Sequence, residues 1–136
     1  MARIVYVNGR YLPYAEAGVH VEDRGFQFAD SVYEVCEVKN RALIDTTRHL
    51  ARLARSLSEL KIAFPMAEPA LRHVLGQVVR RNRVRDGIVY LQVARGQAAP
   101  VEEALLAHPV VIEHLPEVAR AVVVEQGGRD SVRDAA

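Results

Sequence analysis

The stretch Glu22–Lys39, EDRGFQFADSVYEVCEVK, decides the fold of this 136-residue chain. It opens with a charged turn, in which Gly25 can adopt a positive φ at little cost. From Ser31 to Lys39, β-branched and aromatic residues predominate, which is typical of a β-strand. An ordered turn in front of a strand would hold the strand's first side chains firmly, as a functional site requires. Taken alone, however, the stretch is better explained by an ordinary turn and core strand.

The composition is that of a single globular domain. Half of the residues are apolar and 26% are charged, and 18 Lys and Arg residues nearly balance 17 Asp and Glu residues. A net charge of +1 argues against a nucleic-acid or membrane-surface binder, which would need a basic face. The one local basic run, Arg80–Arg85, is interpreted as a solvated helix end, with nucleic-acid binding as the minor alternative.

Several other site classes have no support in the sequence. Cys36 is the only cysteine, so we expect no disulfide framework and a small buried side chain at this position. The five histidines show no metal-ligand spacing, and no metal site is expected. Because no signal pattern and no membrane-length apolar run are present, we expect a cytoplasmic protein with no membrane partner.

Periodicity along the chain predicts two hairpins, two helices and a further strand. The hairpins turn at Asn8-Gly9 and at Asn40-Arg41. One helix, capped by Asp45 or Thr46, has a leucine stripe, and the second has Pro69 in its first turn. The stripe of the first helix is Leu50, Leu53, Leu57 and Leu60, and the apolar face of the second is Leu71, Val74, Leu75, Val78 and Val79.

The last predicted strand, Ile88–Ala94, is almost continuously apolar and therefore central. Together these elements indicate an α+β fold with a mixed sheet covered on one side. Residues 116–125 are ambiguous between helix and strand. We expect one domain over residues 1–96 and a divergent tail of uncertain structure over residues 97–136.

Three blocks of the sequence carry a resemblance to a known family. They are DRGFQFADSVYEV (residues 23–35), RHLARL (48–53) and GIVYLQVARG (87–96). In this order they resemble the class IV aminotransferases, which use pyridoxal 5'-phosphate, and they are most similar to the D-amino-acid transaminase branch. Three ordered blocks are far more specific than one short motif. The resemblance covers roughly the first 96 residues and is expected to stop at Gly96.

The resemblance implies a fold, a reaction and two site residues. The fold is that of the family's N-terminal small domain, and the reaction transfers an amino group between an amino acid and a 2-oxo acid. Tyr33 would line the substrate side of the pocket, and Arg52 would bind the cofactor phosphate with its fork of donors. Without the resemblance, Tyr33 would be an ordinary strand tyrosine and Arg52 a surface arginine like Arg48 or Arg55. The family also implies a homodimer.

Part of the family's machinery has no counterpart in this chain. A Schiff-base lysine is needed, and neither Lys39 nor Lys61 lies in a matching block. The loop at 97–103 lacks the arginine and histidine that bind the substrate carboxylate in the D-amino-acid branch. We therefore expect a partial aminotransferase without turnover on its own. The alternative is a non-catalytic dimerisation or interaction domain derived from the same family.

Overall fold

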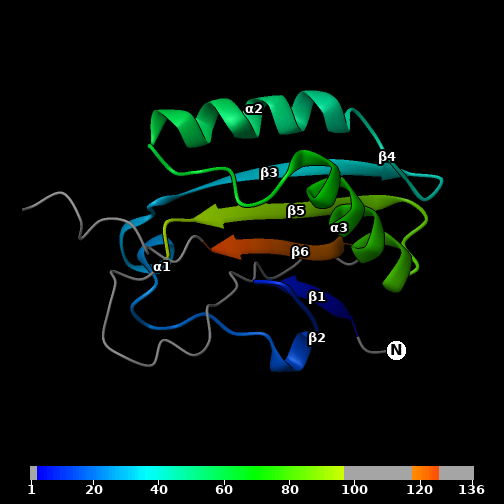
Figure 1. Cartoon of the computed structure of the whole chain (residues 1–136). Coiled ribbons are helices and arrows are strands. Elements are labelled where there is room, and N and C mark those ends of the chain that lie inside the picture. The colour runs from blue at the N-terminus through cyan, green and yellow to red at the C-terminus, as the bar shows by residue number, and fades with distance from the viewer. Residues whose placement is uncertain (1–2, 97–117, 126–136) are drawn as a thin grey trace, which may run out of the picture.

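The computed structural model describes residues 3–96 and 118–125 of the chain. Its elements, in chain order, are β1 (Ile4–Val7), β2 (Arg10–Pro13), a short 3₁₀ helix η1 (Tyr14–Glu16), α1 (Arg24–Phe28), β3 (Ser31–Lys39), β4 (Ala42–Leu43), α2 (Thr46–Glu59), α3 (Glu68–Arg81), β5 (Gly87–Ala94) and β6 (Val118–Glu125). The strands form one sheet in the order β2-β1-β6-β5-β3-β4, with α2 and α3 beside it (Figure 1).

Both predicted hairpins are confirmed. β1 pairs antiparallel with β2, and β3 pairs antiparallel with β4. Asn8 and Gly9 both have positive φ, at 42° and 90°, as a tight two-residue turn between twisted strands requires. Asn40 and Arg41 at the second turn also have positive φ, at 49° and 67°.

The ambiguous segment at residues 116–125 contains β6. This strand lies between β1 and β5 and runs parallel to both. Since β5 also pairs antiparallel with β3, the sheet is mixed, and the predicted fold class is confirmed. The division at Gly96 stays a prediction, because residues 97–117 and 126–136 lie outside the described part of the chain.

The core lies between the two long helices and one face of the sheet. Val89, Leu91 and Val93 alternate along β5 and pack in one apolar cluster with both helices. The predicted leucine stripe of α2 is buried at Leu50, Leu53 and Leu57, and the predicted face of α3 is buried throughout. Leu60 differs: it lies at the C-terminal cap of α2 and is 39% exposed.

The predicted turn at Gly25 is wrong, and the predicted cap of α2 is confirmed in its position but not in its side-chain hydrogen bond. Gly25 lies inside the short helix α1 and does not have a positive φ. Instead, α1 begins where an Asp23 oxygen, Oδ1, accepts a hydrogen bond of 3.0 Å from the backbone N–H of Phe26. At the start of α2, Asp45 occupies the cap position, but its side chain makes no capping hydrogen bond. Its φ of 49° places the residue in the left-handed region instead.

Candidate functional site

The candidate site lies along strand β3. Side chains alternate across a strand, so Tyr33 and Glu34 point to opposite faces of the sheet. Glu34 lies opposite Leu91 of β5 and shares its helix-covered face, whereas Tyr33 lies opposite Gln92 on the other face. Among the described residues, β5 pairs with one side of β3 over most of its length, but β4 pairs with the other side only at Val38 and Lys39. The first part of β3 is therefore a sheet edge.

On the face away from the helices, Tyr33 belongs to an aromatic and polar surface. Its side chain is 65% exposed, and its ring stacks on that of Tyr90 with 5.5 Å between centroids. The Tyr90 hydroxyl donates to Gln92 Oε1 at 3.0 Å, and Gln92 Nε2 donates to Ser31 Oγ at 2.9 Å. Burial, and then the neighbouring Tyr33, raise the pKa of Tyr90. Because these contacts fix Tyr90, the Tyr33 ring packs on a fixed neighbour while most of Tyr33 stays exposed.

On the helix-covered face, Glu34 forms a tight cluster with two residues of α2. Arg52 Nε donates to Oε1 of Glu34 at 2.7 Å, and Arg52 Nη2 donates to Oε2 at 2.7 Å. His49 Nδ1 lies 2.8 Å from Oε2. The Glu34 side chain is 2% exposed, whereas that of Arg52 is 58% exposed.

The protonation of this cluster follows from its contacts. Burial alone would raise the pKa of Glu34, but the hydrogen bonds from Arg52 and His49 outweigh burial, and the pKa lies below its ordinary value. An ionised carboxylate only accepts hydrogen bonds, so His49 Nδ1 must carry the proton it shares with Glu34. The paired carboxylate also raises the pKa of Arg52, which stays a cation.

A second ion cluster fixes the segment that leads into β3. Asp30 Oδ2 accepts from Arg24 Nε at 2.9 Å and from Arg95 Nε at 2.8 Å. Arg95 also donates from Nη2 to the carbonyl of Leu60, just beyond α2, at 2.6 Å. Asp30 and Arg95 together therefore tie α1, the end of β5 and the end of α2 to the residue that precedes β3.

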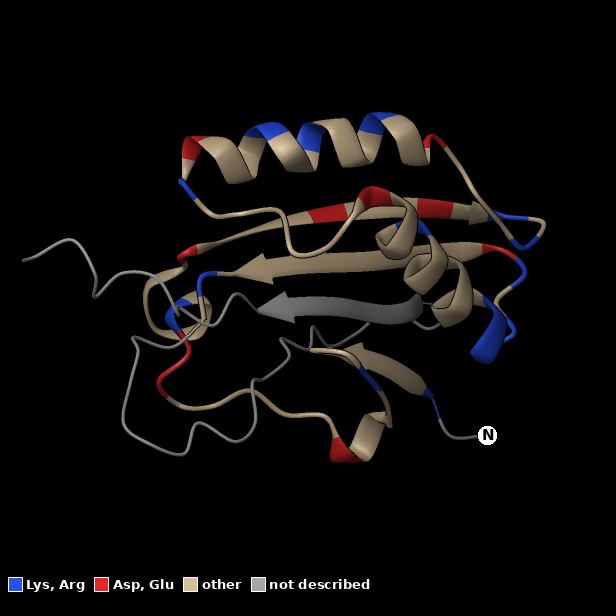
Figure 2. Cartoon of the chain, in the orientation of Figure 1, with Lys and Arg blue, Asp and Glu red and all other residues tan. Residues whose placement is uncertain are grey.

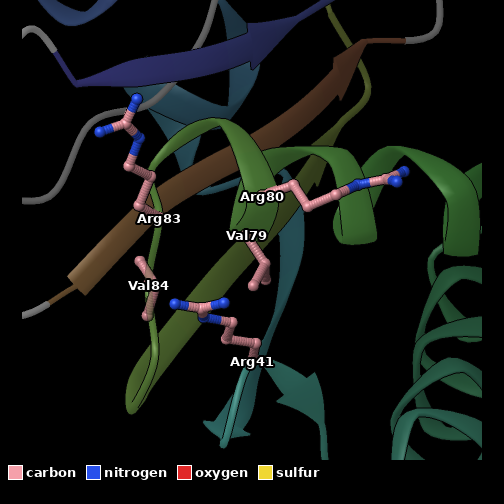
Figure 3. Close-up of a pocket in the computed structure, with 5 residues that line it drawn as sticks. All are labelled: Arg41, Val79, Arg80, Arg83 and Val84. Carbon is pink, nitrogen blue, oxygen red and sulfur yellow. The ribbon is translucent and has the colours of Figure 1, made fainter.

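A cavity of about 300 Å³ lies away from Tyr33 and Arg52, and it is lined by Arg41, Val79, Arg80, Arg83 and Val84. It lies past the far end of β3, where α3 ends and Lys and Arg residues gather (Figure 2). In Figure 3 the side chains of Arg80 and Arg83 point in different directions, and only the Arg41 guanidinium lies between the two valines. These cations do not converge on one point, so the cavity is not the candidate site.

Neither a metal site nor a membrane-spanning helix is found within residues 3–96 and 118–125. In these ranges no three His, Cys, Asp or Glu residues gather in a way that could hold a metal ion. No helix in the same ranges has the length and apolar character needed to cross a membrane.

The two predicted site residues do not contact each other. Tyr33 and Arg52 lie on opposite faces of β3, and their proposed roles stay predictions. Sequence reasoning missed Glu34, which pairs with Arg52 18 positions away, and it missed His49, the second partner of Glu34. It also missed Tyr90. No local signal marks these residues, because only the pairing of β3 with β5 and the placement of α2 over β3 bring their side chains together.

Comparisons with known proteins identify the family of this chain. The family model described as amino-transferase class IV matches residues 31–133. A D-alanine aminotransferase of Bacillus licheniformis is 44% identical over 94 residues, which are 69% of this chain and 33% of the relative. One from Listeria innocua is 39% identical over 101 residues, covering 74% and 35%.

A solved structure gives the same result. The T.th. branched-chain amino acid aminotransferase, complexed with N-(5'-phosphopyridoxyl)-L-glutamate, superposes with a TM-score of 0.67 at 25% identity, over 73% of this chain and 35% of that one. This chain thus spans about a third of the length of the proteins it matches. The family match crosses Gly96, so the expectation that the resemblance stops there is wrong. The chain belongs to the class IV aminotransferases.

Proposed function

We propose that this chain forms part of an aminotransferase of the D-alanine type, which moves an amino group between an amino acid and a 2-oxo acid with pyridoxal 5'-phosphate as cofactor. Family membership and the D-alanine aminotransferase relatives support the proposal. The chain covers about a third of those relatives, so it contributes only part of a complete site.

The observation that carries the proposal is the arrangement of Arg52. Its guanidinium is held by a buried carboxylate and is still 58% exposed. Of its donors, Nη1 has no acceptor among the described residues. A fixed, exposed guanidinium fits a phosphate group, because it offers two parallel donors to phosphate oxygens. Arg52 is therefore the residue of this chain that would hold the cofactor phosphate.

Tyr33 would act on the substrate side. When bound, pyridoxal phosphate supplies an electron sink for the bond that breaks at the substrate's α-carbon. The Tyr33 hydroxyl can donate a hydrogen bond to a substrate carboxylate, and its ring, stacked on Tyr90, forms a wall that fixes the substrate's orientation. Orientation of this kind lowers the barrier because the reacting bond is already aligned.

Turnover also requires a lysine that holds the cofactor and moves a proton. Lys39 lies at the far end of β3, where its Nζ is 3.6 Å from Asp86 Oδ1. Lys61 directly follows the cap of α2, and its backbone carbonyl accepts from Arg95. Neither lysine belongs to the cluster around Arg52. We therefore propose that the 136-residue chain binds the phosphate but does not turn over by itself.

The test compares a phosphorylated ligand with its phosphate-free form. Pyridoxine 5'-phosphate and pyridoxine suit this purpose because neither has an aldehyde that could react with lysines. We expect calorimetry to show tighter binding of the phosphate ester, and an Arg52→Gln variant to lose roughly tenfold or more of that affinity. Pyruvate formation from D-alanine and a 2-oxo acid, with pyridoxal phosphate added, should be undetectable for the chain alone.

The matched control is Arg55→Gln, one turn along α2, where the arginine side chain has no ion pair or hydrogen bond with any described residue. This variant should bind the phosphate ester as the parent chain does. Equal affinity of the Arg52→Gln and Arg55→Gln variants would refute the role of Arg52. Pyruvate formed at a steady rate would refute the proposal that the chain lacks turnover.

A second candidate is an interaction domain that pairs with another copy. Phe26 and Phe28 of α1 are 63% and 65% exposed. Adjacent exposed aromatic side chains are unfavourable in water and are typical of an interaction surface. We propose that they contribute to a homodimer interface. Light scattering after size-exclusion chromatography should show a dimer that a Phe26→Ser/Phe28→Ser double variant shifts to monomer, and a strictly monomeric parent chain would contradict this.

A further inference from the structure

We infer that Glu34 is a positioning residue for oxyanion binding. It binds the edge of the Arg52 guanidinium formed by Nε and Nη2, and so leaves the edge formed by Nη1 and Nη2 for a phosphate. This inference rests on the proposed function, in which Arg52 holds the cofactor phosphate. Its basis is the way in which one carboxylate and one guanidinium are joined.

A guanidinium has five N–H donors in one plane, arranged along two edges that can each bind an oxyanion. One edge consists of Nε and Nη2, and Glu34 accepts from both atoms at 2.7 Å. The second edge consists of Nη1 and the remaining proton of Nη2. Among the described residues no acceptor bonds Nη1, so this edge can bind a phosphate while the pair with Glu34 stays intact.

Glu34 itself is fixed from several directions. It sits on β3 between two residues paired with β5, its side chain is 2% exposed, and His49 Nδ1 holds Oε2 at 2.8 Å. The plane of the carboxylate therefore sets the plane of the guanidinium. An exposed arginine without such a partner samples many rotamers, and that freedom would be lost when a ligand binds. In Arg52 the pair with Glu34 has already removed this rotamer freedom before a ligand binds.

Charge alone predicts the opposite behaviour. The Glu34 carboxylate repels an incoming phosphate, so if only net charge mattered, removing this carboxylate would strengthen phosphate binding. If Glu34 acts by positioning, removing it weakens binding even though the site becomes more positive. The sign of the change therefore separates the two effects.

Two variants at this position give graded changes. Glu34→Gln keeps the size and one carbonyl acceptor for Arg52, whereas Glu34→Ala removes both acceptors. For Glu34→Ala we expect pyridoxine 5'-phosphate to bind roughly tenfold more weakly, about 1.4 kcal/mol, while binding of pyridoxine is unchanged. Glu34→Gln should fall in between. A general loss of structure would weaken both ligands alike, so the ratio of the two affinities reports on positioning, and far-UV circular dichroism checks that each variant is folded.

Arg52→Lys provides an independent variant. An ammonium group can approach either the carboxylate or the phosphate but cannot offer two edges, so it should lose the preference for the phosphate ester even if it keeps the pair with Glu34. The matched control is Arg55→Lys on the same helix, which should keep that preference.

The second readout is nitrogen NMR of arginine side chains in the full 136-residue chain. We expect the Nε–H of Arg52 to exchange slowly with water in the parent chain and in Glu34→Gln, and rapidly in Glu34→Ala. Rapid exchange in the parent chain, with phosphate binding intact, would overturn the positioning role and leave the proposed function standing. Slow exchange with no binding of the phosphate ester would overturn both. Equal or tighter phosphate binding by Glu34→Ala would show that charge dominates and would overturn the inference alone.

Discussion

Replacing Gly25 by alanine should destabilise the chain, although alanine is the better helix former. A Cβ atom added at Gly25 would lie 2.9 Å from the Cβ of Ala94 on β5 and 2.9 Å from Oδ1 of Asp23. It would also lie 3.3 Å from the Cβ of Ser31. The first contact is made by a buried strand residue, and the second by the carboxylate that caps α1. Neither atom can move away without loss of another contact.

Two opposing terms set the magnitude. Overpacking of a filled site costs about 1–3 kcal/mol, and the gain in helix propensity from glycine to alanine is at most about 1 kcal/mol. Gly25 lies in the first turn of a five-residue helix, so the gain is smaller than in a long helix. We therefore expect a net loss of about 1–2 kcal/mol in the free energy of unfolding.

Gly76 offers the matched control. It lies within α3, and a Cβ added there would meet nothing within 4 Å. Gly76→Ala should therefore stabilise the chain by about 0.5–1 kcal/mol. Urea unfolding followed by circular dichroism measures both variants against the parent chain. If Gly25→Ala were as stabilising as Gly76→Ala, the close approach of α1 to β5 would be refuted as the reason for this glycine.

Two further predictions concern ionisable groups. Hydrogen bonds from Arg95 and from Arg24 outweigh the effect of burial and lower the pKa of Asp30. The ionised Asp30 therefore stabilises the fold above about pH 4, and this stabilisation is lost as the pH falls through the pKa of Asp30 in the folded chain. Urea unfolding of Asp30→Asn should show a deficit at neutral pH that shrinks in acid, and a deficit independent of pH would contradict this origin. Burial, and then the nearby Glu34 charge, raise the pKa of Cys36 to about 11. Iodoacetamide should therefore leave Cys36 unmodified in the native chain and alkylate it in urea, as measured by intact mass. Rapid labelling of the native chain would refute the burial of Cys36.

The fold was predictable from the sequence wherever a repeating apolar pattern is explained by burial alone. The stripe at Leu50, Leu53 and Leu57 and the apolar run of β5 are positioned by burial alone, and the structure confirms both. The error at Gly25 has a different origin. A glycine between charged residues is typical of a turn, but here it is required by a close contact with Ala94, which lies 69 positions later in the chain and leaves no local signal.

The candidate site was predictable only in part for the same reason. Tyr33 and Arg52 were selected through a family resemblance, since neither spacing nor composition separates Arg52 from Arg55. What distinguishes the two arginines physically is that only Arg52 meets Glu34, because of the way α2 lies across β3. A sequence pattern specifies the face of an element reliably, but it does not specify which residue of the neighbouring element that face meets.

The alternation of β3 has a consequence for how the proposed site can work. Tyr33 and Glu34 are neighbours in sequence, so the substrate wall and the carboxylate that holds Arg52 begin about 3.8 Å apart at their Cα atoms. They nevertheless lie on opposite faces, and β5 closes one side of the strand. A ligand that contacts both Tyr33 and Arg52 must therefore pass around the other side of β3, before Val38, where the described residues provide no pairing strand. A shift of β3 by one residue would exchange the two faces, placing Tyr33 beneath α2 and Glu34 among the aromatic rings, and would remove both functions together. The register between β3 and β5 is thus as much a part of the proposed site as the two side chains themselves.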